Sequence, residues 1–294
     1  MADNSGNTSY SSSDIVSCGI KCKLHCWLPD EPPQATCLIF HGFKAHARYP
    51  TVRYVAELLQ AQGCIVYAFD MPGHGCSEGV RGYIESADKL VKHGSDAANH
   101  VKALHEDLKL FLVGSSMGAA IALLVSERMD GAPDGIVMLA PMLQLELSNN
   151  KPLRYLLLAL ASIPGLRSVP VIPSNSGDSS IQYRDPVRRK EAEDDELTVT
   201  GKISFASGSA CLELCVMVKA LAPSFTSPMF FMIADEDIVV DSIGAAAMAK
   251  ELFTSVEDKT IKHYNALHGI ICEPDPLRKE IEKDISNWIT SRFA

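Results

Sequence analysis

The stretch Leu108–Val125 reads LKLFLVGSSMGAAIALLV and decides the fold that the sequence predicts. Its first part is an apolar run typical of a buried strand, and its last part has the composition of a helix. The pentapeptide G-x-S-x-G lies between them, where a sharp strand-to-helix turn exposes a serine. Because the backbone closes on itself there, small residues are needed on both sides, and Gly114 and Gly118 supply them. The stretch therefore predicts Ser116 as a nucleophile.

A second G-x-S-x-G match lies at residues 75–79, within DMPGHGCSEG. It follows a predicted strand at 64–70, but VRGYIE comes next and does not resemble the start of a helix. Its glycines are typical of an irregular loop. We therefore expect Ser77 to be structural, with its hydroxyl bonded to the local backbone.

A serine needs a base to remove its proton, and in this strand–turn–helix context the chain order is serine, acid, histidine. His263 lies inside a predicted strand, whereas His268 lies in the loop NALHGI and is free to reach Ser116. The strand pattern at 228–237 ends with Asp235, Glu236 and Asp237, and Asp241 follows it. Position alone favours Asp237 over Asp235 only slightly, so both stay open at this point.

Backbone amides would have to stabilise the oxyanion of an acyl-transfer intermediate. One candidate is the amide of Met117, which directly follows the predicted nucleophile. The other lies in FHGFKAHARY, which follows the first predicted parallel strand. There Gly42 lets the backbone come close, and the amide of Phe43 is the predicted donor.

Strand and helix patterns alternate along most of the chain, which predicts a mostly parallel sheet covered on both faces. The strand patterns cover 37–40, 64–70, 108–114, 135–141, 228–237 and 259–265. The helical patterns cover 51–63, 86–106, 117–128, 243–253 and 276–289. Residues 14–28 look like a hairpin at the sheet edge. We expect a disordered N-terminus at 1–13, a core at 14–142 and 228–294, and an insertion at 143–227, called the cap below, with an amphipathic helix at 210–221.

Composition narrows the possible partners and cofactors. The 294 residues carry a formal net charge of −9, which argues against nucleic acid as a partner. Nine cysteines include Cys18, Cys22 and Cys26, which with His25 could suggest a metal site. A strand would spread these thiols too widely for one ion, so we expect reduced packing cysteines, no metal and a cytoplasmic protein. The N-terminus does not resemble a secretory signal, and no segment is typical of a membrane span.

Five segments together resemble the monoacylglycerol lipase and lysophospholipase branch of the α/β-hydrolase superfamily. They are HGFKAHARY (41–49), AFDMPGHGCSEG (68–79), VGSSMGAAIAL (113–123), ADEDIVVD (234–241) and ALHG (266–269). The resemblance implies a mostly parallel eight-stranded sheet with helices on both faces and an inserted, mainly helical cap. It also implies Asp237 as the acid, Asp241 as the second aspartate of that motif, Ser77 in a structural loop, and no cofactor.

The implied activity is hydrolysis of a fatty-acid ester, with monoacylglycerol as the first candidate substrate. Alternatives are a lysophospholipase or another acyl-ester hydrolase, an acyltransferase, and a binding protein that keeps the fold without catalysis. The resemblance also implies that Arg48, Ser115 and Tyr183 contact the substrate. Ser115 stands where relatives carry histidine and Ala45 where they carry an acid, so we expect Ser115 to tune the choice of alcohol.

The run Leu153–Leu166, LRYLLLALASIPGL, has two interpretations. It could be a cap helix that offers apolar surface to an acyl chain and a membrane, which would make the protein peripherally associated with membranes or lipid droplets. It could equally be a packed cap helix without a membrane role. The sequence predicts no oligomeric state.

Overall fold

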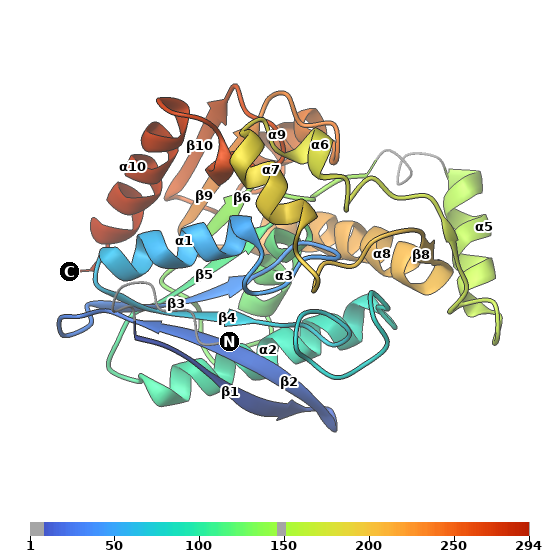
Figure 1. Ribbon diagram of the computed structural model, residues 1–294, viewed down its shortest axis with the longest axis horizontal. Helices are drawn as coiled ribbons and strands as arrows, with labels where there is room; N and C mark the ends of the chain where they lie inside the picture. Colours follow the sequence, from blue (N-terminus) through green and yellow to red (C-terminus); the bar gives the residue numbers. More distant parts are fainter. Residues whose placement is uncertain (1–8, 146–150, 294) are drawn as a thin grey trace.

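An eight-stranded sheet forms the centre of the computed structural model, which describes residues 9–145 and 151–293 (Figure 1). Its strands are β1 Ser9–Ser17, β2 Ile20–Leu28, β3 Ala35–Phe40, β4 Cys64–Phe69, β5 Leu110–Ser115, β6 Gly135–Leu139, β9 Met229–Ala234 and β10 Lys259–Tyr264. The order across the sheet is β1-β2-β4-β3-β5-β6-β9-β10. The pairs β1–β2 and β2–β4 are antiparallel and the others are parallel, so the predicted mostly parallel sheet is confirmed.

Both faces of the sheet are covered, because its central strands are mostly apolar and are buried along nearly their whole length. Side chains alternate between the faces along a strand. Phe40 and Leu112 accordingly belong to one hydrophobic cluster, and Ile39 and Val113 to another. Burial on two sides explains why these strands read as continuous apolar runs rather than as alternating ones.

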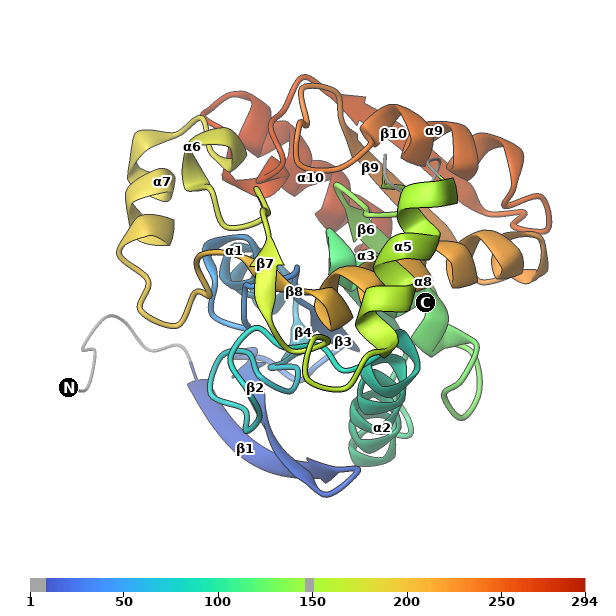
Figure 2. The same ribbon diagram turned by 90° about the vertical axis from the view of Figure 1, so that its right-hand side faces the viewer.

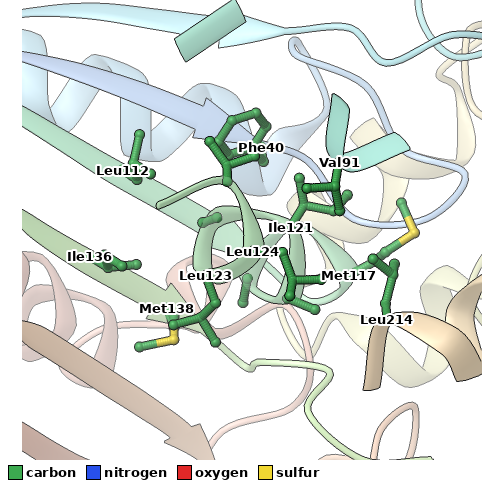
Figure 3. Close-up of a cluster of buried hydrophobic side chains, with 14 of the residues drawn as sticks. Phe40, Val91, Leu112, Met117, Ile121, Leu123, Leu124, Ile136, Met138 and Leu214 are labelled. Atoms are coloured by element: carbon green, nitrogen blue, oxygen red, sulfur yellow. The ribbon is translucent and has the colours of Figure 1, made fainter. Parts of the chain in front are cut away.

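Helices cover the two faces. The helices α1 Pro50–Ala61 and α10 Leu277–Thr290 contribute to the cluster on one side, and α2 Ala87–Leu104, α3 Met117–Ser126 and α9 Ser242–Glu251 to the cluster on the other. Figure 3 shows the second cluster, in which Ile121 and Leu124 of α3 meet Phe40 of β3 and Val91 of α2. This packing fixes the start of α3, and with it the position of Ser116.

The edge hairpin predicted at 14–28 is present, but it begins earlier than expected. Residues 9–13, which the sequence analysis placed in a disordered N-terminus, belong to β1. The ring of Tyr10 packs 5.2 Å from that of Trp27, and its hydroxyl lies 2.6 Å from Nδ1 of His25. Ser11, Ser12 and Ser13 are all exposed, so this part of the strand shows no apolar alternation in the sequence.

The cap lies between β6 and β9, and none of its described elements joins the eight-stranded sheet. They are α5 Lys151–Ser162, β7 Pro170–Ile172, α6 Ser179–Gln182, α7 Pro186–Glu193, β8 Ile203–Ser204, α8 Phe205–Leu221 and the 3-10 helix η1 Ala222–Ser224. Figure 2 shows α5 on the outside of α8, with β7 and β8 beside them. This arrangement is the mainly helical insertion that the resemblance implied.

The last helix of the cap differs from the prediction of an amphipathic helix at 210–221. Helix α8 begins at Phe205 and is buried over most of its surface, with Leu214 and Val218 in the same cluster as α3. It is apolar on nearly all sides, which is typical of a helix inside a protein. Among the described residues, Phe205–Ser224 is the one segment long and apolar enough to cross a membrane, but 61% of its apolar window is buried inside the protein.

Candidate active site

Ser116 occupies a strained turn between β5 and α3. Its backbone has φ 55° and ψ −118°, a combination that residues with a side chain rarely adopt. The amide of Ser116 donates a 3.0 Å hydrogen bond to the carbonyl oxygen of Leu139 in the neighbouring strand. A Cβ on Gly118 would lie 2.0 Å from the carbonyl oxygen of Phe40, and one on Gly114 would lie 2.4 Å from the carbonyl oxygen of Gly118. Neither glycine can therefore carry a side chain, as the sequence predicted.

His268 and Asp237 form a short, buried pair. Nδ1 of His268 lies 2.6 Å from Oδ2 of Asp237, and the aspartate side chain is fully buried. The other carboxylate oxygen accepts hydrogen bonds from the amides of Val239, at 2.8 Å, and Val240, at 3.2 Å. These bonds fix the carboxylate and satisfy its charge. An ionised carboxylate at Nδ1 selects the tautomer with a proton on that nitrogen, which leaves Nε2 free to accept one.

A second aspartate–histidine pair lies close by but faces solvent. Nδ1 of His263 is 2.7 Å from Oδ1 of Asp235, and the two side chains are 51% and 47% exposed. Asp241 caps α9 instead, because its Oδ1 accepts the amide of Gly244 at 2.7 Å. Sequence position alone did not distinguish Asp235 from Asp237 as the partner of the histidine. In the structure, Asp237 contacts His268 and Asp235 contacts His263.

Ser116 and His268 line one small cavity under the cap. Ser115 and Phe43 line it from the core, and cap residues such as Thr198 close it from above. Its volume is about 20 Å³. A single water needs about 10–15 Å³, so the cavity has room for water but not for an acyl chain. The cap therefore closes the site in this conformation.

The loop after β3 packs directly against Ser116. A Cβ on Gly42 would lie 3.3 Å from Cβ of Ser116, so this residue brings the amide of Phe43 close to the serine. Met117 is the first residue of α3, and amides in the first turn of a helix have no acceptor within the helix. The two amides that the sequence predicted as donors therefore flank Ser116.

His41 holds this loop in place as a neutral imidazole. Its Nε2 accepts the amide of Met71 at 3.1 Å, so Nδ1 carries the proton and donates to the carbonyl oxygen of Gly42 at 2.7 Å. Complete burial, together with the neighbouring His74, lowers the pKa of His41 to about 3. The imidazole of His41 therefore stays neutral, with its proton on Nδ1, over the whole physiological range of pH.

Asp70 links the loop after β4 to the edge hairpin and to the loop after β3. Its carboxylate accepts the amides of Ala47 and Cys76, both at 2.7 Å, and lies 3.0 Å from Nε2 of His25. Burial opposes its ionisation, but the contacts with His25 and the other groups outweigh it, and the pKa of Asp70 falls to about 2. A buried carboxylate thus joins three segments that support the site.

Ser77 belongs to this supporting structure. Its hydroxyl donates to the carbonyl oxygen of Asp70 at 2.5 Å and accepts the amide of Lys23 at 2.8 Å. The prediction that Ser77 bonds the local backbone is confirmed. The second G-x-S-x-G match is therefore a structural loop.

Two of the predicted substrate contacts lie elsewhere. The guanidinium of Arg48 is exposed and stands 5.7 Å from the ring centroid of Tyr10, and Arg48 lines a separate cavity beside Asp195. Tyr183 is buried, its ring lies against Gly269, and its hydroxyl has no hydrogen-bond partner in the part of the chain that the structure describes. Neither side chain lines the cavity at Ser116, whereas Ser115 does. Nothing in the sequence of the loop after β3 indicates where the side chain of Arg48 points.

The cysteines that had suggested a metal site are dispersed. Cys22 and Cys26 lie buried on one face of β2, His25 lies on the other face against Asp70, and Cys18 is exposed in the turn. All nine cysteines are free thiols. Within residues 9–145 and 151–293, no group of three or more histidine, cysteine or carboxylate side chains could hold a metal ion.

Two features of the region where the cap meets the core are not predicted by the sequence. Lys44, directly after Phe43, lines the cavity at Ser116. The amide of Gly269, directly after His268, donates to the carbonyl oxygen of Gln182 in the cap at 2.8 Å. Both depend on how the cap folds back over the sheet, and no sequence pattern encodes that.

Comparison with known proteins adds the family. Residues 31–275 match the family model described as serine aminopeptidase, S33. The chain belongs to this family. Its curated relatives include the monoacylglycerol lipase of Mycolicibacterium smegmatis, 26% identical over 277 residues that cover 94% of this chain and 95% of that one. The human monoglyceride lipase is 28% identical over 273 residues, covering 91% of this chain and 86% of that one.

Solved structures agree with this family assignment. The crystal structure of Paleococcus ferrophilus monoacylglycerol lipase has a TM-score of 0.77 and 26% sequence identity, and covers 92% of this chain and 99% of that one. The α/β-hydrolase fold that the sequence predicted is therefore confirmed for this S33 family member. The family description refers to a peptidase, but the curated relatives are lipases. Together they support a serine hydrolase that cleaves esters.

Proposed function

We propose that this protein hydrolyses monoacylglycerol to glycerol and a free fatty acid. The observation that carries the proposal is the 2.6 Å pair of His268 with Asp237, whose histidine lines the same cavity as Ser116. The similarity to monoacylglycerol lipases over more than nine tenths of the chain supports the choice of substrate.

In the proposed reaction, Oγ of Ser116 attacks the ester carbonyl while Nε2 of His268 takes its proton. Asp237 keeps Nδ1 protonated and stabilises the imidazolium that forms. The amides of Phe43 and Met117 donate to the oxyanion of the tetrahedral intermediate. The imidazolium then gives its proton to the leaving glycerol oxygen, and an acyl-enzyme remains.

Water completes the cycle. His268 removes a proton from the water, the resulting hydroxide attacks the acyl carbonyl, and the tetrahedral intermediate expels Oγ of Ser116. The serine regains its proton from His268, and the fatty acid leaves. Every proton that moves is held by Ser116, His268, water or the alcohol, so the residues of the chain suffice for the proposed chemistry.

The experiment compares the wild type with Ser116→Ala. We expect the wild type to release glycerol from monoacylglycerol and to be labelled by a fluorophosphonate, and Ser116→Ala to do neither. Activity of Ser116→Ala near that of the wild type would overturn the assignment of the nucleophile. An unlabelled wild type would favour a binding protein that has lost catalysis.

We further propose that the exposed part of α5 meets a lipid surface. Tyr155 and Leu156 are 59% and 55% exposed, whereas the next residue, Leu157, is buried and lies near Gly208 of α8. Apolar side chains on the outer side of an anchored helix are suited to the interface of a membrane. The cytoplasmic location stays a prediction.

Sedimentation with phosphatidylcholine vesicles tests this contact. Replacing Tyr155 and Leu156 by serine should lower the bound fraction several-fold. The matched control is Val16→Ser, which removes an apolar side chain that is 72% exposed on the edge hairpin. Equal binding of both variants would contradict a membrane role for α5.

A further inference from the structure

Lys44 is a buried cation beside the proposed nucleophile. Only 1% of its surface is exposed, although lysine is almost never fully buried without a partner. It follows Phe43 directly, and it lines the cavity at Ser116. It also lines a second cavity of about 480 Å³, bordered by the cap residues Gly177 and Gly201. Lys44 therefore stands between the proposed catalytic serine and a larger depression that is open to solvent among residues of the cap.

The ammonium group of Lys44 donates a hydrogen bond to one carbonyl oxygen. Its Nζ donates a 2.5 Å hydrogen bond to the carbonyl oxygen of Gly201, and no carboxylate in the described part of the chain forms an ion pair with it. An ammonium has three protons to donate, so a carbonyl alone leaves its charge without a counter-ion. Burial correspondingly lowers the pKa of Lys44. A buried charge of this kind is costly unless something of opposite charge arrives.

The backbone holds this side chain under the cap at a conformational cost. Lys44 has φ 66°, in the left-handed region that favours glycine. Its carbonyl oxygen accepts the amide of Val199 at 3.0 Å, which fixes that conformation. A Cβ on Gly177 would lie 3.8 Å from Nζ, so a small residue stands over the ammonium. The result is space next to the cation rather than a packed side chain.

We propose that Lys44 makes the site accept an ester whose alcohol carries a negative charge, either a phosphate or a carboxylate. The inference rests on the proposed ester hydrolysis and specifies its substrate class. The acyl part of a fatty-acid ester is hydrocarbon, so the charge must belong to the alcohol. The second cavity also borders Lys202, which is exposed, and Asp178, whose carboxylate already accepts the amide and hydroxyl of Ser180.

The alternative is that Lys44 only ties the loop after β3 to the cap. Such a tie would stabilise the closed site equally for every substrate. Charge recognition instead changes the preference between substrates, because one charge-assisted hydrogen bond acts on the anionic ester alone. The ratio of two kcat/KM values separates the two roles, since a loss common to both substrates cancels.

The experiment uses three esters with the same acyl chain in neutral detergent micelles. They are monoacylglycerol, the acylglycerol phosphate and the acyl ester of glyceric acid. Lys44→Gln should lower the ratio of kcat/KM for an anionic ester to that for monoacylglycerol by about tenfold, mainly through KM. Lys44→Arg should keep most of the ratio, because it keeps the charge. Lys250→Gln, which removes an exposed positive charge on α9, should leave it unchanged.

Lys44→Gly provides a second variant that suits the left-handed backbone and also lacks the charge. It should lower the ratio as Lys44→Gln does. Comparing kcat/KM for the phosphate ester with that for the carboxylate ester shows which anion the site prefers. An unchanged ratio, or an equal loss in Lys44→Arg and Lys44→Gln, would overturn the inference. If the wild type neither cleaves monoacylglycerol nor reacts with a fluorophosphonate, the proposed function itself fails.

Discussion

The amide of Gly269 donates a 2.8 Å hydrogen bond to the carbonyl oxygen of Gln182, which binds the residue after His268 directly to the cap. The ring of Tyr183 lies against the same glycine, and a Cβ there would come within 2.5 Å of Cε1 of that ring. The loop that carries His268 and the segment around α6 therefore share one contact surface. A shift of either one moves the other.

Gly269→Ala should damage the site through this contact. The added methyl group must displace Tyr183 or the backbone of His268, and overpacking of this kind costs about 1–3 kcal/mol. We expect kcat to fall at least about tenfold. The double variant Gly269→Ala/Tyr183→Leu provides the space and should recover part of kcat, measured with a short chromogenic ester. If the second substitution gives no recovery, the two residues do not act through this contact.

Asp237→Asn and Asp235→Asn form a matched pair, since each aspartate contacts one histidine. Asparagine at position 237 would favour the wrong tautomer of His268, so kcat should fall by about 10³–10⁴. Asp235→Asn alters an exposed pair with His263 and should change kcat less than about twofold. Steady-state kinetics, with circular dichroism as a check of folding, measure both. Similar losses in the two variants would contradict the assignment of Asp237.

Ser77→Ala should affect stability rather than chemistry. The hydroxyl bridges the carbonyl oxygen of Asp70 and the amide of Lys23, so its removal leaves two polar groups without a partner. The expected loss in the free energy of unfolding is about 1–3 kcal/mol. Labelling by a fluorophosphonate should persist at a temperature where the variant is folded. Loss of labelling under those conditions would make Ser77, and not Ser116, the reactive serine.

Lowering the pH should reduce the free energy of unfolding, because two buried histidines resist protonation in the folded state. Complete burial lowers the pKa of His41 to about 3 and that of His74 to about 4, from an ordinary 6.5. Because the unfolded chain binds protons below pH 6.5 and the folded one does not, each imidazole removes about 1.4 kcal/mol of stability per pH unit from 6.5 down to about 4. Asp70, with a pKa of about 2 against an ordinary 3.8, adds its own loss only below pH 4.

Urea unfolding at pH 7, 6 and 5 measures this slope. His74→Gln removes one of the two imidazoles, so its free energy of unfolding should fall less steeply with decreasing pH than that of the wild type. Parallel curves for the two proteins would show that His74 becomes protonated in the folded state.

The sequence predicted the elements of the site better than its surroundings. Ser116, Asp237 and His268 each follow a strand of the sheet, and parallel strands bring their carboxyl ends to one edge of the sheet. The strain at Ser116 was also visible in advance, because two flanking glycines are needed to produce it. Local sequence and sheet geometry therefore sufficed for these residues.

The cap was harder to predict, because its contacts are long-range. Nothing near Arg48 in the sequence indicates that it stacks on Tyr10 of the edge hairpin. Tyr183 was expected at the substrate, yet it packs behind His268, on Gly269. The sequence predicts an amphipathic helix at 210–221, yet α8 is buried over most of its surface and packs against α3. Such contacts depend on tertiary packing, which a single sequence does not display.

The cavity of about 20 Å³ at Ser116 has a kinetic consequence. A fluorophosphonate cannot enter it, so covalent labelling must wait until the cap opens. The labelling rate should then rise with probe concentration only to a plateau, and that plateau is the opening rate of the cap. A probe used to count active serines would thus also measure how fast the cap opens.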